Sequence, residues 1–197
     1  MKRLLAVVLI AVMTVSPVPV YAVPSGFRAA AGEREEQEAV PLTAASETGV
    51  AGFVERLYTV VLERPSDPGG KADWISRLSS GSIDGAAAAH GFFFSREYTV
   101  KNKPDDVFVE DLYRTLLGRP SDSSGKENWL VTLEIGKTRL GVFEGFADSA
   151  EFSQICSSYG INRGYYHSEE ILDQNYPVTA FVYRLYAKIL GRTPDRG

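Results

Sequence analysis

Residues 53–78 read FVERLYTVVLERPSDPGGKADWISRL, and residues 108–133 read FVEDLYRTLLGRPSDSSGKENWLVTL. The two stretches are identical at 14 of 26 positions without a gap, and their starts lie 55 residues apart (108 − 53). A third copy, FVYRLYAKILGRTPDRG, begins at Phe181. Self-similarity at a fixed period of this length is typical of repeat architectures. The repeat therefore decides the architecture, but it does not decide the chemistry.

Each copy opens with the spacing of an amphipathic helix. In the first copy Phe53, Leu57 and Val61 follow one another at intervals of four, and a second row adjoins them. Such rows give a helix one broad apolar face. The rows are Phe53, Leu57, Val61 with Val54, Tyr58, Leu62; Phe108, Leu112, Leu116 with Val109, Tyr113, Leu117; and Phe181, Leu185, Ile189 with Val182, Tyr186, Leu190.

The ends of this first helix differ between copies. Gly118 and Gly191 suit the left-handed residue that ends a helix, whereas Glu63 holds that position in the first copy and predicts a different ending. At the other end, Asp105 and Asp106 follow a proline and are predicted N-caps of the helix in the second copy.

The rest of each copy predicts further short helices. Asp67 before Pro68 is typical of an N-cap with proline at the first helical position, and the helix that follows carries the tryptophan. A third helix and a short last one, capped by Ser95 or Ser149, complete the unit. No segment alternates with period two over the length of a strand. The predicted fold class is all-α, with tandem repeats of three to four short helices and about 55 residues per repeat.

The N-terminus is typical of a secretory signal peptide. Lys2 and Arg3 precede an apolar run of twelve residues (4–15), and Val20-Tyr21-Ala22 supplies small residues for a peptidase. A membrane anchor is the alternative, but twelve residues are too few to span about 30 Å of hydrocarbon. We expect the protein to be secreted or extracellular, and this includes association with the cell surface. After removal of the signal peptide, we expect no segment that spans a membrane.

The predicted organisation has six parts. They are a signal peptide (1–22), a flexible linker (23–51), helical repeat 1 (52–103), helical repeat 2 (104–156), an insert (157–179) and an incomplete repeat 3 (180–197). Residues 23–49 are rich in Ala, Glu, Ser and Thr and have no aromatic residue after Phe27. The third copy stops before its tryptophan helix, so we expect a fragment of a longer protein. The first helix of that copy must dock on repeat 2 or stay exposed.

Charge narrows the choice of partner. The formal net charge is −4, and removal of Lys2 and Arg3 leaves 19 basic and 25 acidic side chains, or −6. An acidic balance spread along the chain argues against nucleic acid and against anionic lipid. The expected partner is a protein or another component of the cell surface, with cell-wall glycan as the alternative.

The combined motif resembles the domain of unknown function 4214 family over about residues 52–197. The residues that carry the resemblance are Phe108, Leu112, Tyr113, Leu117, Gly118, Arg119, Asp122, Gly125, Trp129, Gly145, Phe146, Ser149, Glu151 and Phe152. Repeat 1 departs from it with Glu63 for Gly and Tyr98 for Phe. The segments 156–164 and 173–175 resemble the ending and restart found in Gram-positive members. The resemblance implies an exported bacterial helical module, often repeated and often attached to other secreted domains. It implies no activity, so no catalytic residue is carried over.

For several residues we weigh a chemical role, such as metal binding, against a structural role. Asp67, Asp122 and Asp195 suggest calcium, but each loop has only one carboxylate, and N-capping is the favoured interpretation of these residues. Cys156 is the only cysteine, which excludes an internal disulfide and a cysteine-based zinc site. We interpret it as a small buried residue at a helix end. No metal and no cofactor are expected.

Catalytic patterns are not apparent. His90 and His167 lack a partnered serine or cysteine pattern, and there is no G-x-S-x-G or H-E-x-x-H motif. Glu169-Glu170 is typical of a solvated surface pair. We therefore expect that the chain is not an enzyme.

Aromatic residues supply the alternative function. Trp74 and Trp129 are predicted to be largely buried against the Leu57/Val61 and Leu112/Leu116 rows. The candidates for stacking on a sugar are instead in the insert: Tyr159, Tyr165 and Tyr166, with Asn162, Arg163 and His167 as hydrogen-bonding neighbours. The leading hypothesis is a secreted, non-enzymatic module for interaction or scaffolding at the bacterial cell surface. The alternative is a glycan- or wall-binding accessory module of a secreted enzyme.

Overall fold

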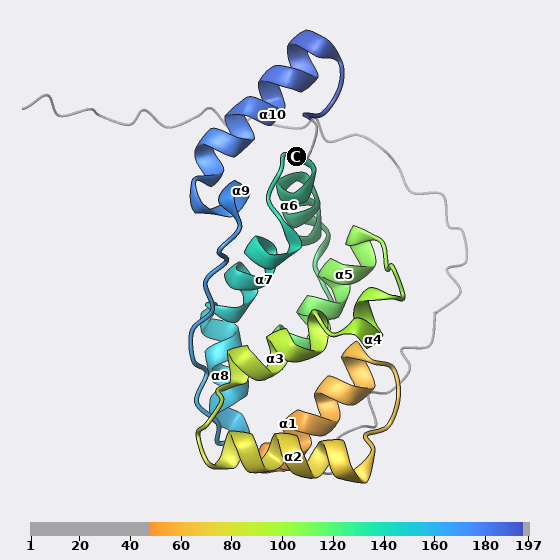
Figure 1. Cartoon of the computed structure of the whole chain (residues 1–197), viewed down its shortest axis with the longest axis vertical. Helices are drawn as coiled ribbons and strands as arrows, with labels where there is room; N and C mark the ends of the chain where they lie inside the picture. The colour runs from red at the N-terminus through yellow and green to blue at the C-terminus, as the bar shows by residue number, and fades with distance from the viewer. Residues whose placement is uncertain (1–47, 195–197) are drawn as a thin grey trace, which may run out of the picture. The chain divides into compact units, whose positions relative to one another are not determined.

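The computed structural model describes residues 48–194, and within that range every regular element is helical (Figure 1). Repeat 1 contains α1 (Gly49–Arg56), the π-helix η1 (Leu57–Val61), α2 (Pro68–Ser79), α3 (Gly85–Phe93) and α4 (Arg96–Thr99). Repeat 2 contains α5 (Asp105–Leu112), the π-helix η2 (Tyr113–Leu117), α6 (Ser123–Glu134), α7 (Arg139–Ala147) and α8 (Ala150–Ser158). The chain continues with α9 (Ile171–Gln174) and α10 (Tyr176–Leu190). The predicted all-α repeat is confirmed.

Some predictions fall outside or at the edge of the described residues. The signal peptide and most of the linker lie outside them, as does Asp195. The last three residues of the predicted linker belong to α1, because that helix begins at Gly49. The first helix of the third copy begins at Tyr176, inside the predicted insert.

Side-chain caps start most of the helices. Asp67 accepts a hydrogen bond from the backbone N–H of Gly70 at 2.7 Å, and Asp122 accepts one from Gly125 at 2.8 Å. Ser95 and Ser149 cap α4 and α8 in the same way. These carboxylates and hydroxyls satisfy N–H groups that a helix leaves unpaired.

The start of α5 differs from the prediction. Its N-cap is Pro104, and no side chain caps it, so the prediction of Asp105 and Asp106 as N-caps is wrong. Asp105 and Asp106 lie one and two positions after the N-cap, in the first turn, where the positive end of the helix dipole stabilises a carboxylate.

The first helix ends alike in both repeats. Gly118 has φ +73°, and Glu63 has φ +59° at the corresponding position. The expectation that repeat 1 ends differently is therefore wrong. Glu63 is anchored by two ammonium groups, Lys101 Nζ at 3.0 Å and Lys103 Nζ at 2.7 Å. These ion pairs hold a side chain where the backbone favours glycine.

The two repeats share one core. Phe53 packs on Phe152 of repeat 2, with ring centroids 6.5 Å apart, and Phe108 packs on Phe93 of repeat 1 at 6.0 Å. The predicted apolar face is confirmed, since its main row is fully buried in both repeats: Phe53, Leu57, Val61, Phe108, Leu112 and Leu116. Each first helix is thus buried partly against the other repeat.

A side chain also joins the repeats. Arg56 at the end of α1 donates from Nε to the carbonyl of Thr115 at 2.8 Å and from its other arm to the carbonyl of Arg114. Both carbonyls lie in η2, so the cation meets the negative end of that helix.

Helix α10 lies beside α6 and α9 (Figure 1). Ala180 and Tyr183 are buried, and the Tyr183 ring lies directly over Gly136, which follows α6. Tyr176 reaches the carbonyl of Thr132 with its hydroxyl at 3.5 Å. The helix therefore docks on repeat 2 through one side only. Within residues 48–194, no helix is both long enough and apolar enough to cross a bilayer.

Candidate functional site

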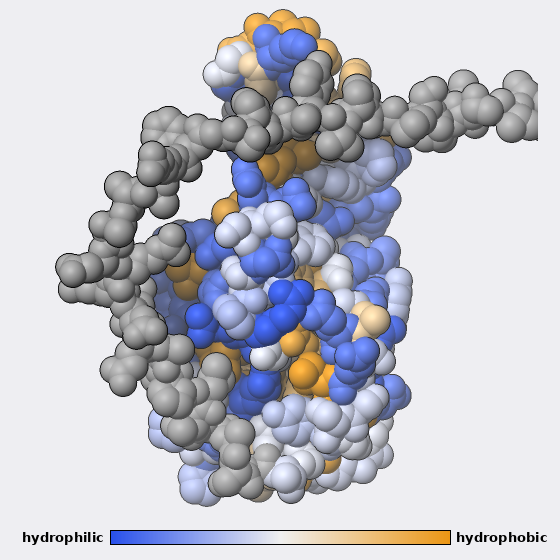
Figure 2. Space-filling view, turned by 180° about the vertical axis from the view of Figure 1, so that it is seen from behind, coloured by the Kyte–Doolittle hydropathy of each residue, from blue (hydrophilic) through white to orange (hydrophobic). Residues whose placement is uncertain are grey.

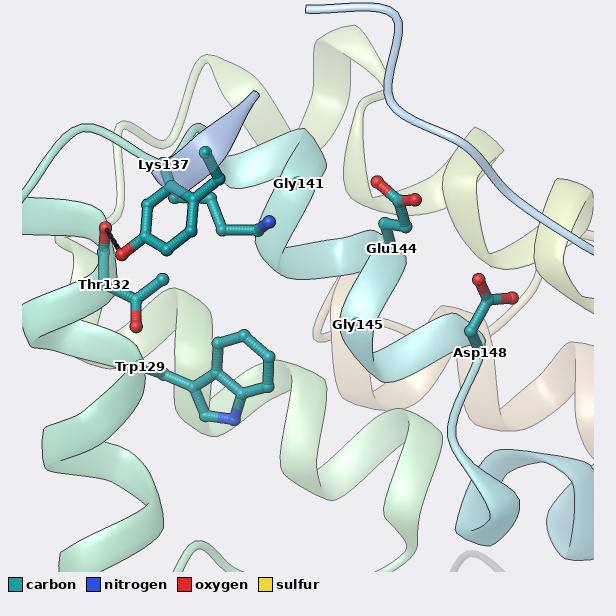
Figure 3. Close-up of a pocket in the computed structure, with 8 residues that line it drawn as sticks. Trp129, Thr132, Lys137, Gly141, Glu144, Gly145 and Asp148 are labelled. Atoms are coloured by element: carbon teal, nitrogen blue, oxygen red, sulfur yellow. Dashed lines mark hydrogen bonds between the residues drawn. The ribbon is translucent and has the colours of Figure 1, made fainter. Parts of the chain in front are cut away.

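A groove of about 460 Å³ opens between α6, α7 and the start of α10. Figure 3 shows the Trp129 indole and the carboxylates of Glu144 and Asp148 along it. The lining residues are Trp129, Thr132, Lys137, Gly141, Glu144, Gly145, Asp148 and Tyr176.

Both tryptophans stand beside a glycine of the next helix. The Trp129 ring lies 5.0 Å from that of Phe146, and a Cβ added to Gly145 would meet its indole at 2.6 Å. Trp74 has the same relation to Phe92 at 5.0 Å. Both tryptophans are mostly buried and pack against the core, which agrees with the prediction. The aromatic rings against which they pack belong to α3 and α7, not to the predicted rows.

The surroundings of the two tryptophans differ at the residue three positions later in the same helix. In repeat 1, Arg77 places its guanidinium 4.8 Å from the Trp74 ring centre. The corresponding residue of repeat 2 is Thr132 (77 + 55), which is too short to cover the Trp129 ring. Trp129 therefore lacks the guanidinium that stands over Trp74, although a groove adjoins each tryptophan and the surrounding helices are alike.

The carboxylates of the groove are also specific to repeat 2. Glu144 replaces His90, and Asp148 replaces Phe94. His167 Nδ1 contacts the Glu144 carboxylate at 2.8 Å, and the backbone N–H of Ser168 donates to it at 3.2 Å. These two contacts fix Glu144 in place from the insert.

Asp148 has a cationic neighbour, Arg163, at 3.5 Å. Burial raises the pKa of Asp148 above its usual value, and the attraction of Arg163 opposes that rise. The other end of the groove carries a cation of its own, since Lys137 Nζ lies 4.8 Å from the Tyr176 ring centre. The groove thus combines an indole face, two acceptor carboxylates and an ammonium donor.

The insert tyrosines do not form the predicted platform. Tyr165 is 66% exposed, but Tyr166 packs inward, stacked on His90 with ring centroids 4.7 Å apart. Tyr159 lies partly buried against Phe53 at 5.8 Å. The expectation that Tyr165 and Tyr166 are exposed side by side is wrong, because the Tyr166 ring stacks on the His90 ring. Of their expected neighbours, Arg163 instead faces Asp148.

Metal-binding chemistry has no support in the described range. Asp67 and Asp122 serve as the predicted caps. No group of three or more His, Cys, Asp or Glu side chains in residues 48–194 is placed to hold an ion.

The nucleophile candidates have structural positions. Cys156 is buried, and burial raises the pKa of its thiol to about 12, as expected for an inert residue at the end of a helix. Ser168 lies next to His167, but its hydroxyl donates to Asp173 at 2.6 Å. Asp173 also accepts from the backbone N–H of Thr138 at 2.9 Å, so this cluster ties the insert to the start of α7.

A second surface lies on α10. Phe181, Leu185 and Ile189 are 62%, 43% and 68% exposed, whereas the corresponding residues of repeats 1 and 2 are fully buried. Figure 2 shows hydrophobic side chains gathered over this helix, at the top of the view. We call this surface the α10 face; it comprises Val178, Phe181, Val182, Leu185, Ile189 and Leu190. Tyr176 of α10 lines the groove. The groove and the α10 face therefore adjoin opposite sides of α10.

No curated protein and no solved structure matches the chain. The family described as a domain of unknown function (DUF4214) matches twice in tandem, over residues 42–102 and 89–156. The two matches cover more than half of the chain and include the cap, glycine and tryptophan positions described above. The chain therefore belongs to the DUF4214 family.

Proposed function

We propose that this chain is an exported, non-enzymatic helical repeat module that binds a protein partner at the bacterial cell surface. The observation that carries the proposal is the α10 face. Three large apolar side chains on that helix face solvent where their counterparts are core residues. Exposed apolar surface of this kind is typical of protein interaction sites.

Other features support a binding role over catalysis. The residues common to the repeats act as caps, turn residues and core, and the only cysteine is buried. Export is supported by the sequence of residues 1–22 alone. Mass spectrometry of the protein from the culture medium should find an N-terminus at or near Val23; uncut Met1 in a membrane fraction argues against export.

Photo-cross-linking in the cells that make the protein tests the binding role. A photoreactive phenylalanine analogue is placed at position 181 and, as a control, at Val100, which is 69% exposed on repeat 1. We expect a discrete protein adduct from position 181 only. Adducts of equal yield from both positions, or none from position 181, argue against a partner on the α10 face.

A saccharide is the second candidate ligand, and the Trp129 indole that lines the groove favours it. A sugar ring stacks its C–H face on an aromatic ring while its hydroxyls bond to polar neighbours. The carboxylates of Glu144 and Asp148 line the same groove as the indole (Figure 3). We expect retention on insoluble cell wall or a defined polysaccharide.

Two substitutions in the Trp129 groove, compared with one control substitution at Trp74, test the saccharide site. Trp129→Ala removes the stacking face, and Thr132→Arg rebuilds the cover that Arg77 gives Trp74. Each should weaken binding about tenfold or more, equivalent to about 1.4 kcal/mol. Trp74→Ala is the matched control and should leave binding unchanged. Equal losses from Trp74→Ala and Trp129→Ala would place the saccharide elsewhere.

A further inference from the structure

We propose that the groove beside Trp129 binds an arginine side chain of a protein partner, with its guanidinium stacked on the indole and paired with the carboxylates of Glu144 and Asp148. This inference rests on the proposed role in binding a protein, and it adds a contact site away from the α10 face. It commits to a guanidinium because repeat 1 places one on the corresponding tryptophan.

The first step is the arrangement in repeat 1. The Arg77 guanidinium lies 4.8 Å from the Trp74 ring centre, and a carboxylate oxygen of Asp73 lies 3.5 Å from Arg77 Nη1. An aromatic face attracts a cation, and a guanidinium also stacks on the ring through its own plane. Repeat 1 thus contains, on one helix, the three parts of a guanidinium site: the indole, the cation and a carboxylate.

The second step is the loss of that cation in repeat 2. The residues that correspond to Asp73 and Arg77 are Asn128 and Thr132, each 55 positions later. The Thr132 hydroxyl donates to the carbonyl of Asn128 at 2.6 Å, within its own helix. These two positions of α6 therefore supply neither the cation nor the carboxylate that holds it.

The third step is the gain of two acceptors on the neighbouring helix. Glu144 and Asp148 stand where repeat 1 has His90 and Phe94. They are four residues apart on α7, so they lie on one face of that helix. Both line the same groove as the Trp129 indole (Figure 3). Repeat 2 keeps the aromatic face, lacks the cation and adds carboxylates, which is the complement of a guanidinium.

The insert holds both carboxylates in place. Glu144 is contacted by His167 Nδ1 at 2.8 Å and by the backbone N–H of Ser168 at 3.2 Å. Asp148 lies 3.5 Å from Arg163. A carboxylate accepts about four hydrogen bonds, so these contacts leave acceptor capacity on both groups. A guanidinium has five N–H donors in a rigid fork, and can serve two carboxylates while its plane lies on the indole.

The opposite end of the groove carries a donor. Lys137 Nζ lies 4.8 Å from the Tyr176 ring centre, and both residues line the groove. An ammonium group there suits a main-chain carbonyl of the peptide that bears the arginine. The volume of about 460 Å³ is in the range of ligand sites in proteins. The groove therefore accommodates one side chain together with adjoining peptide.

A saccharide is the competing occupant, because sugar hydroxyls also bond to carboxylates. The arginine is favoured for two reasons. A charged guest compensates the two carboxylates, which a neutral sugar does not. Repeat 1 also shows a guanidinium, and no other group, stacked in the corresponding place over Trp74.

The indole N–H signals provide the test, since the chain contains two tryptophans. The full chain, labelled with ¹⁵N, is titrated with the peptide acetyl-Gly-Arg-Gly-amide. We expect the Trp129 signal to move and saturate with a dissociation constant of about 1 mM or below, while the Trp74 signal stays in place. The citrulline peptide has the same shape without the charge and should bind at least about tenfold more weakly. A Trp129 signal that stays in place up to about 10 mM arginine peptide, or equal affinity for both peptides, overturns the proposal.

Variants of the groove test the carboxylates. Glu144→Gln and Asp148→Asn should each weaken binding of the arginine peptide about tenfold. The matched control is Glu127→Gln, which removes an exposed charge from α6 outside the groove and should leave binding unchanged. Unchanged binding by the folded double variant Glu144→Gln/Asp148→Asn overturns the proposal. The citrulline comparison uses the unmodified chain, so it decides the question even where a variant is unstable.

The outcomes separate this inference from the proposed function. A neutral glucan oligomer or a glucosamine oligomer that moves the Trp129 signal, where the arginine peptide does not, assigns the groove to saccharide and overturns the inference. A position-181 adduct without a response at Trp129 keeps the proposed function and overturns the inference. A response to the arginine peptide without that adduct keeps the groove and overturns the α10 face as the partner site.

Discussion

Glu63 and Gly118 occupy the same place in their repeats, and both have a left-handed backbone, with φ +59° and +73°. A residue with a Cβ costs about 1–2 kcal/mol in that region, so Glu63 is retained against its backbone preference by Lys101 and Lys103. We expect Glu63→Ala to lose the ion pairs and keep the strain, whereas Glu63→Gly loses the pairs and relieves it. Chemical denaturation should find Glu63→Gly more stable than Glu63→Ala by about 1 kcal/mol.

Gly118 gives the reciprocal experiment. Gly118→Ala should destabilise the protein by about 1 kcal/mol or more, because an added Cβ also meets the Ile155 side chain at 3.1 Å. Equal stability of Gly118→Ala and the unmodified chain would show that this turn can relax.

Thr115 is buried completely, and its hydroxyl has no hydrogen-bond partner among the described residues. A buried polar group without a partner costs about 1–3 kcal/mol. Val60 holds the corresponding place in repeat 1. We therefore expect Thr115→Val to raise the free energy of unfolding by about 1 kcal/mol. Thr115→Ser, which keeps the hydroxyl, should not; a destabilised valine variant would reveal a partner for the hydroxyl.

Asp111 forms a buried polar cluster at the junction of the repeats. Its carboxylate accepts from the Tyr98 hydroxyl at 2.8 Å and pairs with Lys103 Nζ at 2.8 Å. Burial raises the pKa of Tyr98, and the adjacent carboxylate raises it further. Asp111→Ala leaves the buried Tyr98 hydroxyl without its acceptor and leaves Lys103 paired with Glu63 alone, so it should cost about 1–3 kcal/mol. Asp111→Asn still accepts from Tyr98 and should cost less, as measured by urea unfolding.

Gly145 is required by the indole beside it. A Cβ there would lie 2.6 Å from Trp129, so Gly145→Ala must displace the ring, at a cost of about 1–3 kcal/mol. The control is Gly69→Ala, where the nearest atom would be at 3.7 Å and alanine favours the helix. Thermal melting should show a loss for the first and little change for the second. Tryptophan fluorescence should shift only for the first; an unshifted spectrum with full stability argues that the indole is free to move.

Local signals in the sequence predicted local structure well. Asp67, Asp122, Ser95 and Ser149 cap helices as expected, because the capping contact spans only three residues. Two local predictions failed, at the N-terminus of α5 and at Glu63, and the other errors concern contacts between elements. The ring that packs on each tryptophan, Phe92 or Phe146, belongs to the next helix. The groove further depends on Tyr176, which a stretch of irregular chain brings to α6. The repeat spacing alone contains no sign of either.

His90 gives the fold a dependence on pH. Its ring is stacked between Phe94 at 4.8 Å and Tyr166 at 4.7 Å, and burial lowers its pKa below the usual 6.5. The unfolded chain therefore binds this proton more readily than the folded chain. The stability that His90 contributes is complete above pH 6.5 and is lost as the pH falls from there to the folded pKa.

His90→Phe keeps an aromatic ring in the stack and removes the titrating group. Between about pH 7.5 and pH 5 we expect the free energy of unfolding to fall less in this variant than in the unmodified chain. The lowered pKa values of Glu63, Glu97 and Glu151 add losses only below their usual value of 4.5, outside this window. The matched control is His167→Gln, at a half-exposed histidine, which should retain the His90 effect. Parallel pH profiles for the unmodified chain and His90→Phe would show that the stacked ring is protonated as easily in the folded state as in the unfolded one.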